Sequence, residues 1–470
     1  MSRTLQTSEP VRDAGSFPLS LARFFPLAAK RFSKILEKAL VATSGPLKGR
    51  LVTNRQTAAS HEVVKSTIAL LTGGGDRPYA LGLAKALIAT GVHLDFIGSD
   101  DLDSHELRES RTLTFVNLRG SQTEDASLAR KVWRVVLYYT RLVRYASGAE
   151  PKVFHILWNN KFQFFDRTVL MLYYRLRGKR VALTAHNVNA GRRDRNDSVL
   201  NRLTLRVQYH LSDHIFVHTQ AMKRELLEDF SIPEGTITVI PFGINNSVPD
   251  TDVTPALAKR QLGVGESDRT LLFFGNIGPY KGLEFLIAAF QRIAAQNQDY
   301  RLIIAGKPRP GCDQYADEIR RTIDSHGTRT RVTQRFEYIA DGETELYFKA
   351  ADVLVLPYRQ VSQSGVLILA YSFGLPVIAT DVGSLREDII EGRTGFLCRP
   401  CNPVDLAKTI EAYFQSDLFG ALNDRRSEIR EYARGRYSWD AVSQATRQVY
   451  QELLSNSTGR SGDRYVDARR

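Results

Sequence analysis

The sequence predicts an α/β protein made of two doubly wound, Rossmann-like parallel sheets that follow one another along the chain. Short apolar runs alternate with helical patterns from Ser66 onward, and a second alternating set begins at Arg269. Residues 246–265 between the two sets are rich in proline and polar residues, as in an interdomain linker. A chain of 470 residues is also too long for one hydrophobic core.

The first half begins with a strand and a glycine loop. We expect its strands at residues 67–71, 93–98, 113–118, 152–157, 180–185, 214–217 and 236–240. Helices are predicted between most of them, including residues 79–90. The loop after the first strand contains Gly73, Gly74 and Gly75 but does not spell G-x-G-x-x-G, so we do not predict a dinucleotide site. Its glycines either let a ligand approach the backbone or close a tight turn.

The second half is organised around residues 350–380. We expect its strands at residues 271–274, 301–305, 331–333, 352–356 and 376–379. The polar loop 359–365 joins the strand at 352–356 to a predicted helix at 366–373, which Gly374 ends. A strand, a glycine turn and a helix N-terminus form an anion site, because free N–H groups and the helix dipole favour phosphate. The sequence therefore predicts a phosphate site at residues 362–367.

These patterns predict six segments. They are a basic, partly disordered extension at 1–60, a first domain at 61–245, the linker at 246–265, a second domain at 266–437, a closing helix at 438–455, and a disordered tail at 456–470.

Composition narrows the class of protein. Hydrophobic residues make up 43% and charged residues 24%, as in ordinary globular proteins, and no apolar run reaches the ~18 residues of a spanning helix. Three cysteines and a poor signal peptide favour a reducing, cytoplasmic setting. The net charge of +13 indicates an acidic partner: nucleic acid, anionic lipid or anionic substrate. No recognised RNA- or DNA-binding motif occurs, so nucleic acid is the least favoured.

Two basic amphipathic segments bear on the partner. They span residues 19–40 and 128–145, where aromatic and aliphatic residues recur among lysines and arginines. The segment at 19–40 is a helix on the cytoplasmic face of an anionic membrane, a helix packed on the domain, or a mostly disordered tail. The segment at 128–145 is either a core-packed helix with a solvated basic side or a membrane-facing helix that receives a lipid-linked acceptor.

Three motifs in the second half go beyond these general patterns. They are FFGNIGPYKGL at 273–283, FEYI at 336–339 leading to YFKAADVLVLPY at 347–358, and GLPVIATDVG at 374–383 leading through Glu387 to GRTGFL at 392–397. In order and spacing they resemble the family 4 glycosyltransferases. That large retaining family has the B-type glycosyltransferase fold (GT-B), in which two Rossmann-like domains face each other across a cleft. The resemblance covers residues 66–455 and is strongest from 271 to 400.

The resemblance implies transfer of a sugar from a nucleotide-diphosphate donor, held by the second domain, to an acceptor held by the first. It implies retention at the anomeric carbon and no metal or other cofactor. Lys281 and His186 match the family's phosphate-binding lysine and cleft histidine, and are the catalytic candidates. The other phosphate-binding candidates are Gly275, Asn276, Ser364, Gly365 and Val366. The nucleotide or sugar candidates are Gln363, Leu367 and Glu387, and the acceptor-side candidates are Gly73, Gly74 and Gly75.

The sequence also departs from the family. Val361 and Leu369 occupy the positions of its usual pair of glutamates, and Asn276 replaces a common arginine. The donor nucleotide and sugar stay open. Ser384-Leu385-Arg386-Glu387 spells a capping box, which would explain Glu387 without a role at the donor.

The favoured function is transfer to a lipid-linked saccharide in cell-surface polysaccharide synthesis. The alternatives are a catalytically silent sugar- or lipid-binding relative and an epimerase or phosphorylase of the same fold.

Overall fold

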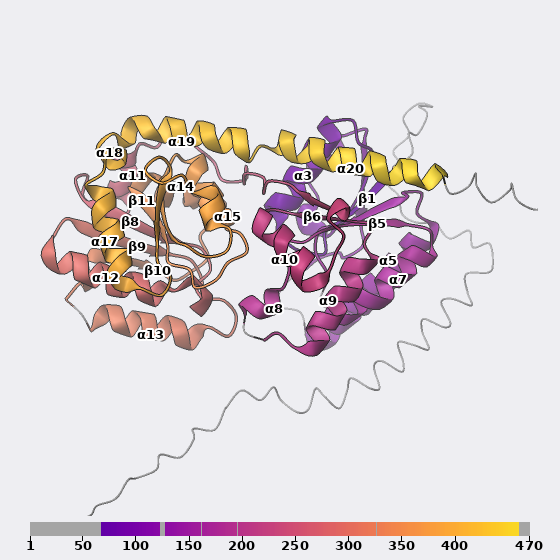
Figure 1. The fold of residues 1–470 in the computed structure, drawn as a ribbon, viewed down its shortest axis with the longest axis horizontal. Helices are drawn as coiled ribbons and strands as arrows, with labels where there is room; N and C mark the ends of the chain where they lie inside the picture. The colour runs from indigo at the N-terminus through magenta and orange to yellow at the C-terminus, as the bar shows by residue number, and fades with distance from the viewer. Residues whose placement is uncertain (1–66, 123–126, 161, 195, 326, 460–470) are drawn as a thin grey trace, which may run out of the picture. The chain divides into compact units, whose positions relative to one another are not determined.

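The computed structural model describes residues 67–122, 127–160, 162–194, 196–325 and 327–459. The chain divides into two units, Met1–Val63 and Val64–Arg470. The predicted extension at 1–60, its amphipathic segment at 19–40 and most of the predicted tail lie outside the described residues. The second unit contains two parallel sheets (Figure 1). The predicted fold class is confirmed.

The first sheet has the strand order β3-β2-β1-β4-β5-β6-β7, all parallel. Its order reverses at β1, as in a doubly wound sheet. The strands are β1 Ile68–Leu71, β2 Leu94–Gly98, β3 Leu113–Asn117, β4 Val153–Ile156, β5 Arg180–Thr184, β6 His214–Val217 and β7 Ile237–Val239. Most are apolar and buried, because helices cover both faces.

The second sheet has the order β10-β9-β8-β11-β12-β13, again parallel. Its strands are β8 Arg269–Phe274, β9 Tyr300–Ala305, β10 Val332–Arg335, β11 Val353–Leu356, β12 Val377–Thr380 and β13 Gly395–Cys398. The sequence analysis did not predict β13. This edge strand begins with glycine and leaves Phe396 and Leu397 half-buried, so it lacks the continuous apolar run of a central strand.

Helices connect the strands. Those of the first half are α3 Arg77–Ala89, α4 His105–Arg108, α5 Leu128–Gly148, α6 Gln163–Phe165, the π-helix η3 Asp166–Leu170, α7 Met171–Leu176, α8 Ala190–Arg193, α9 Val199–Leu211 and α10 Gln220–Phe230. Those of the second half are α11 Pro255–Gln261, α12 Leu283–Gln296, α13 Asp313–Asp324, α14 Asp341–Ala350, α15 Gly365–Ser372, α16 Leu385–Asp388, α17 Pro403–Phe414, α18 Asp417–Gly420, α19 Leu422–Arg436 and α20 Trp439–Gly459. The short 3₁₀ turns are η2 Asp100–Leu102, η4 Glu234–Thr236, η5 Pro279–Lys281 and η6 Arg329–Arg331. No helix in the described part is both long and apolar enough to cross a membrane.

Helix α11 lies inside the segment predicted as a linker. Its Lys259 is buried, and the ammonium group donates to Asp352 Oδ2 over 3.0 Å. The same carboxylate oxygen accepts from the Thr270 N–H over 2.8 Å. Because Asp352 directly precedes β11 and Thr270 lies in β8, this ion pair fastens α11 to the second sheet.

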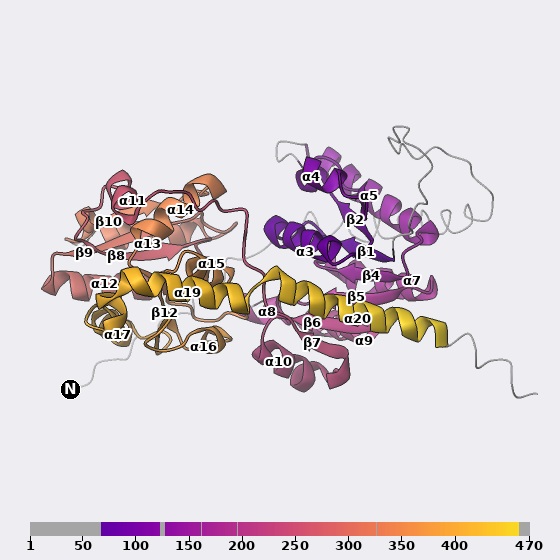
Figure 2. The ribbon, with the colours of Figure 1, turned by 90° about the horizontal axis from the view of Figure 1, so that it is seen from above.

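Helix α20 returns the chain to the first sheet, where it packs beside α3 (Figure 2). Val442, Val449, Tyr450 and Leu453 belong to the core of that domain. In Figure 1, α3 and α20 lie above the first sheet and α5, α7, α9 and α10 lie below it. The helix runs through Gly459, four residues beyond the predicted end.

Candidate functional site

The candidate phosphate site begins where β8 ends. Gly275 has a φ of 99°, and a Cβ there would lie 2.8 Å from Lys281 Nζ and 3.4 Å from the Val366 side chain. These three predicted residues therefore lie together. Lys281 is only 5% exposed, and its ammonium group donates to the Phe274 carbonyl over 3.3 Å. Burial lowers the Lys281 pKa, and no carboxylate of the described residues forms an ion pair with it.

The second part of this site is the N-terminus of α15. Ser364 caps the helix, because its Oγ accepts from the Leu367 N–H over 3.3 Å. The N–H groups of Gly365 and Val366 lie in the first turn, where a helix supplies no partner of its own. Gln363 Nε2 is buried and has no hydrogen-bond partner among the described residues. The predicted loop thus offers donors beside Lys281.

Other positive groups near this site were missed by sequence reasoning. Arg309, after β9, stacks on the Tyr280 ring at 5.3 Å and forms an ion pair with Asp194 of the first domain at 3.2 Å. Arg193 stacks on the same ring at 5.3 Å and also binds Asp194. The two guanidinium groups lower the Asp194 pKa to about 2. The GKPR run at 306–309, a glycine and two cations after a strand, was the available signal.

In the first domain, His186 follows β5 within a group of aromatic rings. Trp158 stacks on it with ring centroids 4.1 Å apart, and Tyr79 meets it edge-on at 4.7 Å. His186 Nδ1 and His218 Nε2 are 2.9 Å apart, and His218 Nδ1 lies 3.2 Å from the Ile240 carbonyl. A carbonyl only accepts, so His218 Nδ1 carries a proton, and in the neutral pair His186 donates to His218. His186 Nε2 is then a bare acceptor, buried and without a partner among the described residues.

His186 is held neutral. Burial lowers its pKa well below 6.5, and the nearby His218 and His155 lower it further. A neutral imidazole with a free Nε2 can accept a hydrogen bond from a hydroxyl group but is a weak proton acceptor near pH 7. His218 positions this ring through its hydrogen bond to His186.

The two halves of the candidate site meet at Phe242, which follows β7. A Cβ on Gly365 would lie 3.5 Å from the Phe242 ring. The same ring lies 6.1 Å from His186 and 5.1 Å from His218, centroid to centroid. The N-terminus of α15 and the His186 group therefore share one aromatic neighbour.

Glu387 makes its hydrogen bonds to the first domain. Its carboxylate accepts from the backbone N–H groups of Gln220 and Ala221, over 2.9 and 2.8 Å, at the start of α10. The capping-box prediction is wrong, because Ser384 Oγ makes no capping hydrogen bond and the Glu387 carboxylate caps a helix of the other domain. Two unsatisfied N–H groups on α10 attract the carboxylate more strongly than its own short helix does.

The glycine loop contacts the protein itself. A Cβ on Gly73 would lie 1.9 Å from the Trp158 carbonyl oxygen, and one on Gly75 would lie 2.0 Å from the Trp158 ring. A Cβ on Gly74 would meet the Arg119 guanidinium group at 1.7 Å. Gly73 and Gly74 also have φ values of 59° and 75°. The loop therefore closes a tight turn against Trp158, the residue that stacks on His186.

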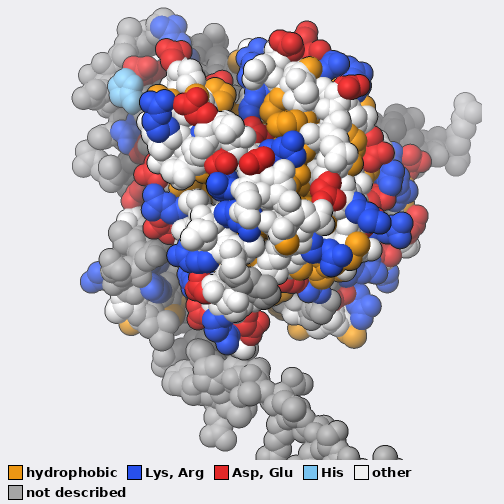
Figure 3. All heavy atoms as spheres, turned by 90° about the vertical axis from the view of Figure 1, so that its left-hand side faces the viewer, with side chains coloured by type: hydrophobic (Ala, Val, Ile, Leu, Met, Phe, Trp, Pro, Cys, Tyr) orange, Lys and Arg blue, Asp and Glu red, His pale blue; other side chains and the backbone are white. Residues whose placement is uncertain are grey.

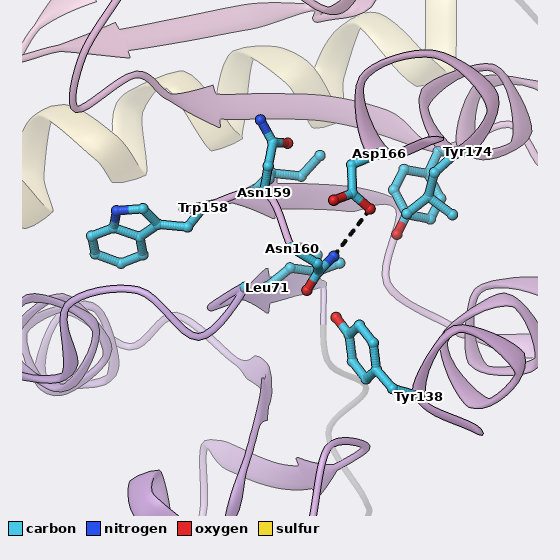
Figure 4. A pocket seen from close by; sticks show the side chains of 10 residues that line it. Leu71, Tyr138, Trp158, Asn159, Asn160, Asp166 and Tyr174 are labelled. Carbon is cyan, nitrogen blue, oxygen red and sulfur yellow. Dashed lines mark hydrogen bonds between the residues drawn. The ribbon is translucent and has the colours of Figure 1, made fainter. Parts of the chain in front are cut away.

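A small pocket lies beside this loop, lined in part by Gly73, Trp158 and Asn160 (Figure 4). Asp166, the first residue of η3, is 3% exposed, and its Oδ1 accepts from Tyr139 over 2.9 Å and from Asn160 over 3.3 Å. Its Oδ2 has no partner among the described residues. Burial raises the Asp166 pKa to about 6.

Two of the three positions that depart from the family pattern lie in apolar surroundings. Val361 is 8% exposed and Leu369 is 7% exposed, and both belong to the core of the second domain. Asn276 is exposed next to Gly275. No group of three or more His, Cys, Asp or Glu side chains in the described residues could hold a metal ion.

Comparison with known proteins agrees with this geometry. Residues 73–248 match the family model described as Glycosyltransferase Family 4, and residues 268–416 match the one described as Glycosyl transferases group 1. The D-inositol 3-phosphate glycosyltransferase of Corynebacterium glutamicum is 24% identical over 82% of this chain and 93% of its own. Several other curated relatives match over only 57% to 60% of their own length.

Solved structures show the same fold. Sucrose-phosphate synthase from Thermosynechococcus elongatus superposes with a TM-score of 0.66 at 20% identity, over 83% of this chain and 99% of its own. Anabaena HepE in complex with UDP-glucose superposes with a TM-score of 0.62 at 18% identity, over 83% and 99% of the two chains. With both family models in sequence order and both sheets arranged as in these structures, the chain belongs to the family 4 glycosyltransferases and has the two-domain GT-B fold.

Proposed function

We propose that this protein transfers a sugar, with retention of its anomeric configuration, from a nucleoside-diphosphate donor to an acceptor on the first domain. The observation that carries the proposal is Lys281, a buried ammonium group without a carboxylate partner in the described residues. It lies against Gly275 and Val366, next to the first N–H groups of α15. A buried cation is costly unless an anion joins it, and a diphosphate is the anion that this family handles.

The chemistry follows from charge. When the bond between sugar and diphosphate breaks, negative charge develops on the departing diphosphate. Lys281 and the N-terminal dipole of α15 favour that charge in a site of low dielectric. Arg309 adds a further cation at the same edge of the second sheet. Because these groups supply the positive charge, we expect turnover to persist in the presence of a chelator.

His186 is assigned to the donor sugar. Its bare Nε2 accepts a hydrogen bond from a sugar hydroxyl, and the ring is fixed by Trp158 and His218. Gln363, with its unpartnered amide nitrogen, and the exposed Asn276 are the neutral groups that replace the family's usual charged contacts. A uridine nucleotide is the first donor to test, because the similar HepE was crystallised with UDP-glucose.

The proposed acceptor is a lipid-linked saccharide used in cell-surface polysaccharide assembly on the cytoplasmic side of the membrane. Support comes from the exposed apolar and basic side chains on one side of the first domain, along α5, α7 and α9. The inositol phosphate named for the Corynebacterium relative is the competing, soluble class of acceptor.

Calorimetry tests the donor half of the proposal. The protein should bind UDP, GDP or ADP, or one of their sugar conjugates, with saturation, and Lys281→Met should weaken that binding. In a turnover assay with membrane extract, Lys281→Met should lower the release of nucleoside diphosphate by about 100- to 1000-fold. Absence of saturable binding to every nucleotide would instead favour a catalytically silent relative, and the anomeric signal of the product in NMR decides retention.

A further inference from the structure

Exposed apolar side chains gather on one side of the first domain. Most of the large apolar side chains that are exposed in the described residues lie on α5, on the run α6–η3–α7, and on α9. The most exposed on each are Trp133 at 64%, Leu176 at 85% and Val199 at 74%. Those in the second domain, such as Leu257 and Val404, lie singly on different helices. Single exposed apolar residues are ordinary on a protein surface, but a group on neighbouring helices indicates an interaction site.

The three helical segments form one continuous surface. Tyr173 Oη of α7 donates to the Val143 carbonyl of α5 over 3.1 Å. Arg167 Nη1 of η3 donates to Asn201 Oδ1 of α9 over 2.8 Å. All three segments lie below the first sheet in Figure 1, and α9 contacts both η3 and α7. We call the exposed sides of α5, α6–η3–α7 and α9 the α5–α7–α9 face.

The face is wider than the sequence predicted. Within α5, Tyr138, Tyr139, Leu142 and Ala146 are buried against the domain, so only part of that helix is free. On η3–α7, Val169, Leu172 and Leu176 recur at helical spacing on one side and are exposed. On α9, Val199, Leu200 and Leu203 do the same.

The exposed charged side chains described on this face are all positive. Lysine and arginine are exposed on α5 and α9, as at Lys131, Arg141, Arg144, Arg202 and Arg206. In the described residues of the three segments the one acidic side chain is Asp166, which is 3% exposed. The end of the second domain that carries α12, α13 and α17 looks different, because acidic and basic side chains alternate there (Figure 3).

We propose that the α5–α7–α9 face docks on an anionic lipid surface. Its leucine, valine and aromatic side chains enter the boundary between headgroups and acyl chains, and its arginines and lysines meet the lipid phosphates. A second copy of this chain is a poorer partner, because two such faces would bring cations against cations. An anionic lipid layer provides both the apolar depth and the opposite charge.

The face also borders the candidate site. Asn201 of α9 donates to Asn189 Oδ1 over 3.0 Å, and Asn189 caps α8 in the loop that His186 opens. If the proposed transferase function holds, docking brings this edge of the first domain close to lipid-linked acceptors. The docking itself does not depend on catalysis and is measured without donor.

The test is vesicle co-sedimentation of the full chain. Vesicles contain phosphatidylglycerol and phosphatidylcholine in equal parts, or phosphatidylcholine alone. The triple variant Leu172→Gln, Leu176→Gln, Leu203→Gln removes apolar area from the face. The control, Leu257→Gln with Val404→Gln, removes exposed apolar residues of 40% and 41% exposure from the second domain. We expect the wild type and the control to bind the anionic vesicles. The triple variant should bind them at least about tenfold more weakly.

Fluorescence adds a readout of orientation. Of the three tryptophans, Trp133 is exposed on α5, whereas Trp158 and Trp439 pack on Tyr79. Brominated acyl chains should quench the wild type on anionic vesicles, and Trp133→Phe should lose most of that quenching while still binding. Arg141→Gln with Arg144→Gln should weaken binding at low salt and reduce its sensitivity to salt.

Three results would overturn the inference: equal binding of the triple variant and the control, equal wild-type binding to neutral and anionic vesicles, or undiminished quenching in Trp133→Phe. Nucleotide binding by calorimetry separates this outcome from the proposed function. A triple variant that leaves vesicles but still binds nucleotide supports the docking face, and failure of nucleotide binding in every variant affects the transferase proposal alone.

Discussion

At the scale of single residues, the candidate site depends on how closely Lys281 approaches Gly275. Gly275→Ala would place a methyl group 2.8 Å from the ammonium nitrogen, at a backbone φ of 99° that disfavours any side chain. We expect it to displace Lys281 and to lower turnover at saturating donor at least tenfold. Gly263→Ala is the matched control, because Gly263 has a φ of 71° and nothing within 4 Å of its added Cβ.

Both glycine variants should lose about 1–2 kcal/mol of unfolding free energy from the left-handed backbone alone. Turnover then separates them, since Gly263→Ala should keep wild-type turnover. Equal losses of turnover in the two variants would remove Gly275 from the phosphate site.

The protonation state of His186 makes a second prediction at this scale. Because burial holds its pKa well below 6.5, the ring is neutral near pH 7 and adds no inflection near pH 6.5 to the rate profile. His186→Gln, which keeps a hydrogen-bond acceptor, should lower turnover by a constant factor across pH 5.5–8, and His186→Ala should lower it more. A wild-type inflection near pH 6.5 that is missing in His186→Gln would instead make His186 a proton acceptor.

The sequence predicted the site residues that belong to short motifs following recognisable strands. Gly275, Lys281 and Ser364 follow strands that were recognisable, and they do come together or cap a helix as expected. The Asp194 partner of Arg309 and the target of Glu387 could not be predicted in this way. Each takes part in a contact between residues more than a hundred positions apart, which local patterns do not encode.

At the scale of elements, Glu387 connects α16 to the start of α10 in the other domain. Glu387→Ala leaves the Gln220 and Ala221 N–H groups without their acceptor, and we expect it to lower the unfolding free energy by about 1–2 kcal/mol. Glu431→Ala, on an exposed part of α19, should change it by less than about 0.5 kcal/mol. Urea unfolding followed by circular dichroism measures both, and equal effects would deny Glu387 this role.

Elements were predictable where one physical signal dominates. Strands β1 and β11 are fully buried and so appear as uninterrupted apolar runs. The edge strand β13 and the helix α11 lack such a signal, because each owes its place to one-sided contact with the second domain. The π-helical turn η3, which positions Asp166, likewise has no periodicity of its own in the sequence.

At the scale of the whole molecule, α20 follows the second domain in the sequence but packs against the first domain. Trp439 lies against Gly82 and Gly243, and its Nε1 donates to the Ile244 carbonyl over 2.9 Å. Tyr450 Oη and His155 Nδ1 of β4 are 2.6 Å apart. The buried apolar side chains of α20 contribute about 1.5–3 kcal/mol each, which together is comparable with the stability of a domain.

Removal of residues 439–470 should therefore unfold the first domain and leave the second able to bind nucleotide. Removal of residues 460–470 is the control and should change neither property. Limited proteolysis and calorimetry distinguish the two chains. A first domain that resists protease without α20 would show that its core is complete without that helix.

Acid sensitivity is a property of the whole chain. His155, His186 and His218 are neutral in the folded protein, because burial lowers the pKa of His155 to about 3, that of His218 to about 4, and that of His186 well below 6.5. The unfolded chain binds these protons below about pH 6.5, so unfolding takes up protons and stability falls as pH decreases. Asp166 and Asp388 act in the opposite direction, since burial raises both pKa values to about 6 and the folded protein holds those protons first.

These opposing groups determine how steeply the unfolding free energy changes with pH. Below about pH 6, each of these histidines adds up to one proton to the unfolded chain and each of these carboxyl groups adds up to one to the folded chain. Each such proton changes the slope by roughly 1.4 kcal/mol per pH unit. Asp166→Asn removes one compensating proton and should steepen the slope between pH 6 and 5 by up to about 1.4 kcal/mol per pH unit, while stabilising the protein above pH 7, where a buried charge is lost. Urea unfolding at pH 5, 6, 7 and 8 measures both curves. If the plots of unfolding free energy against pH run parallel for the two proteins, Asp166 has the same pKa in the folded and unfolded chains. Burial beside the glycine loop then does not raise that pKa.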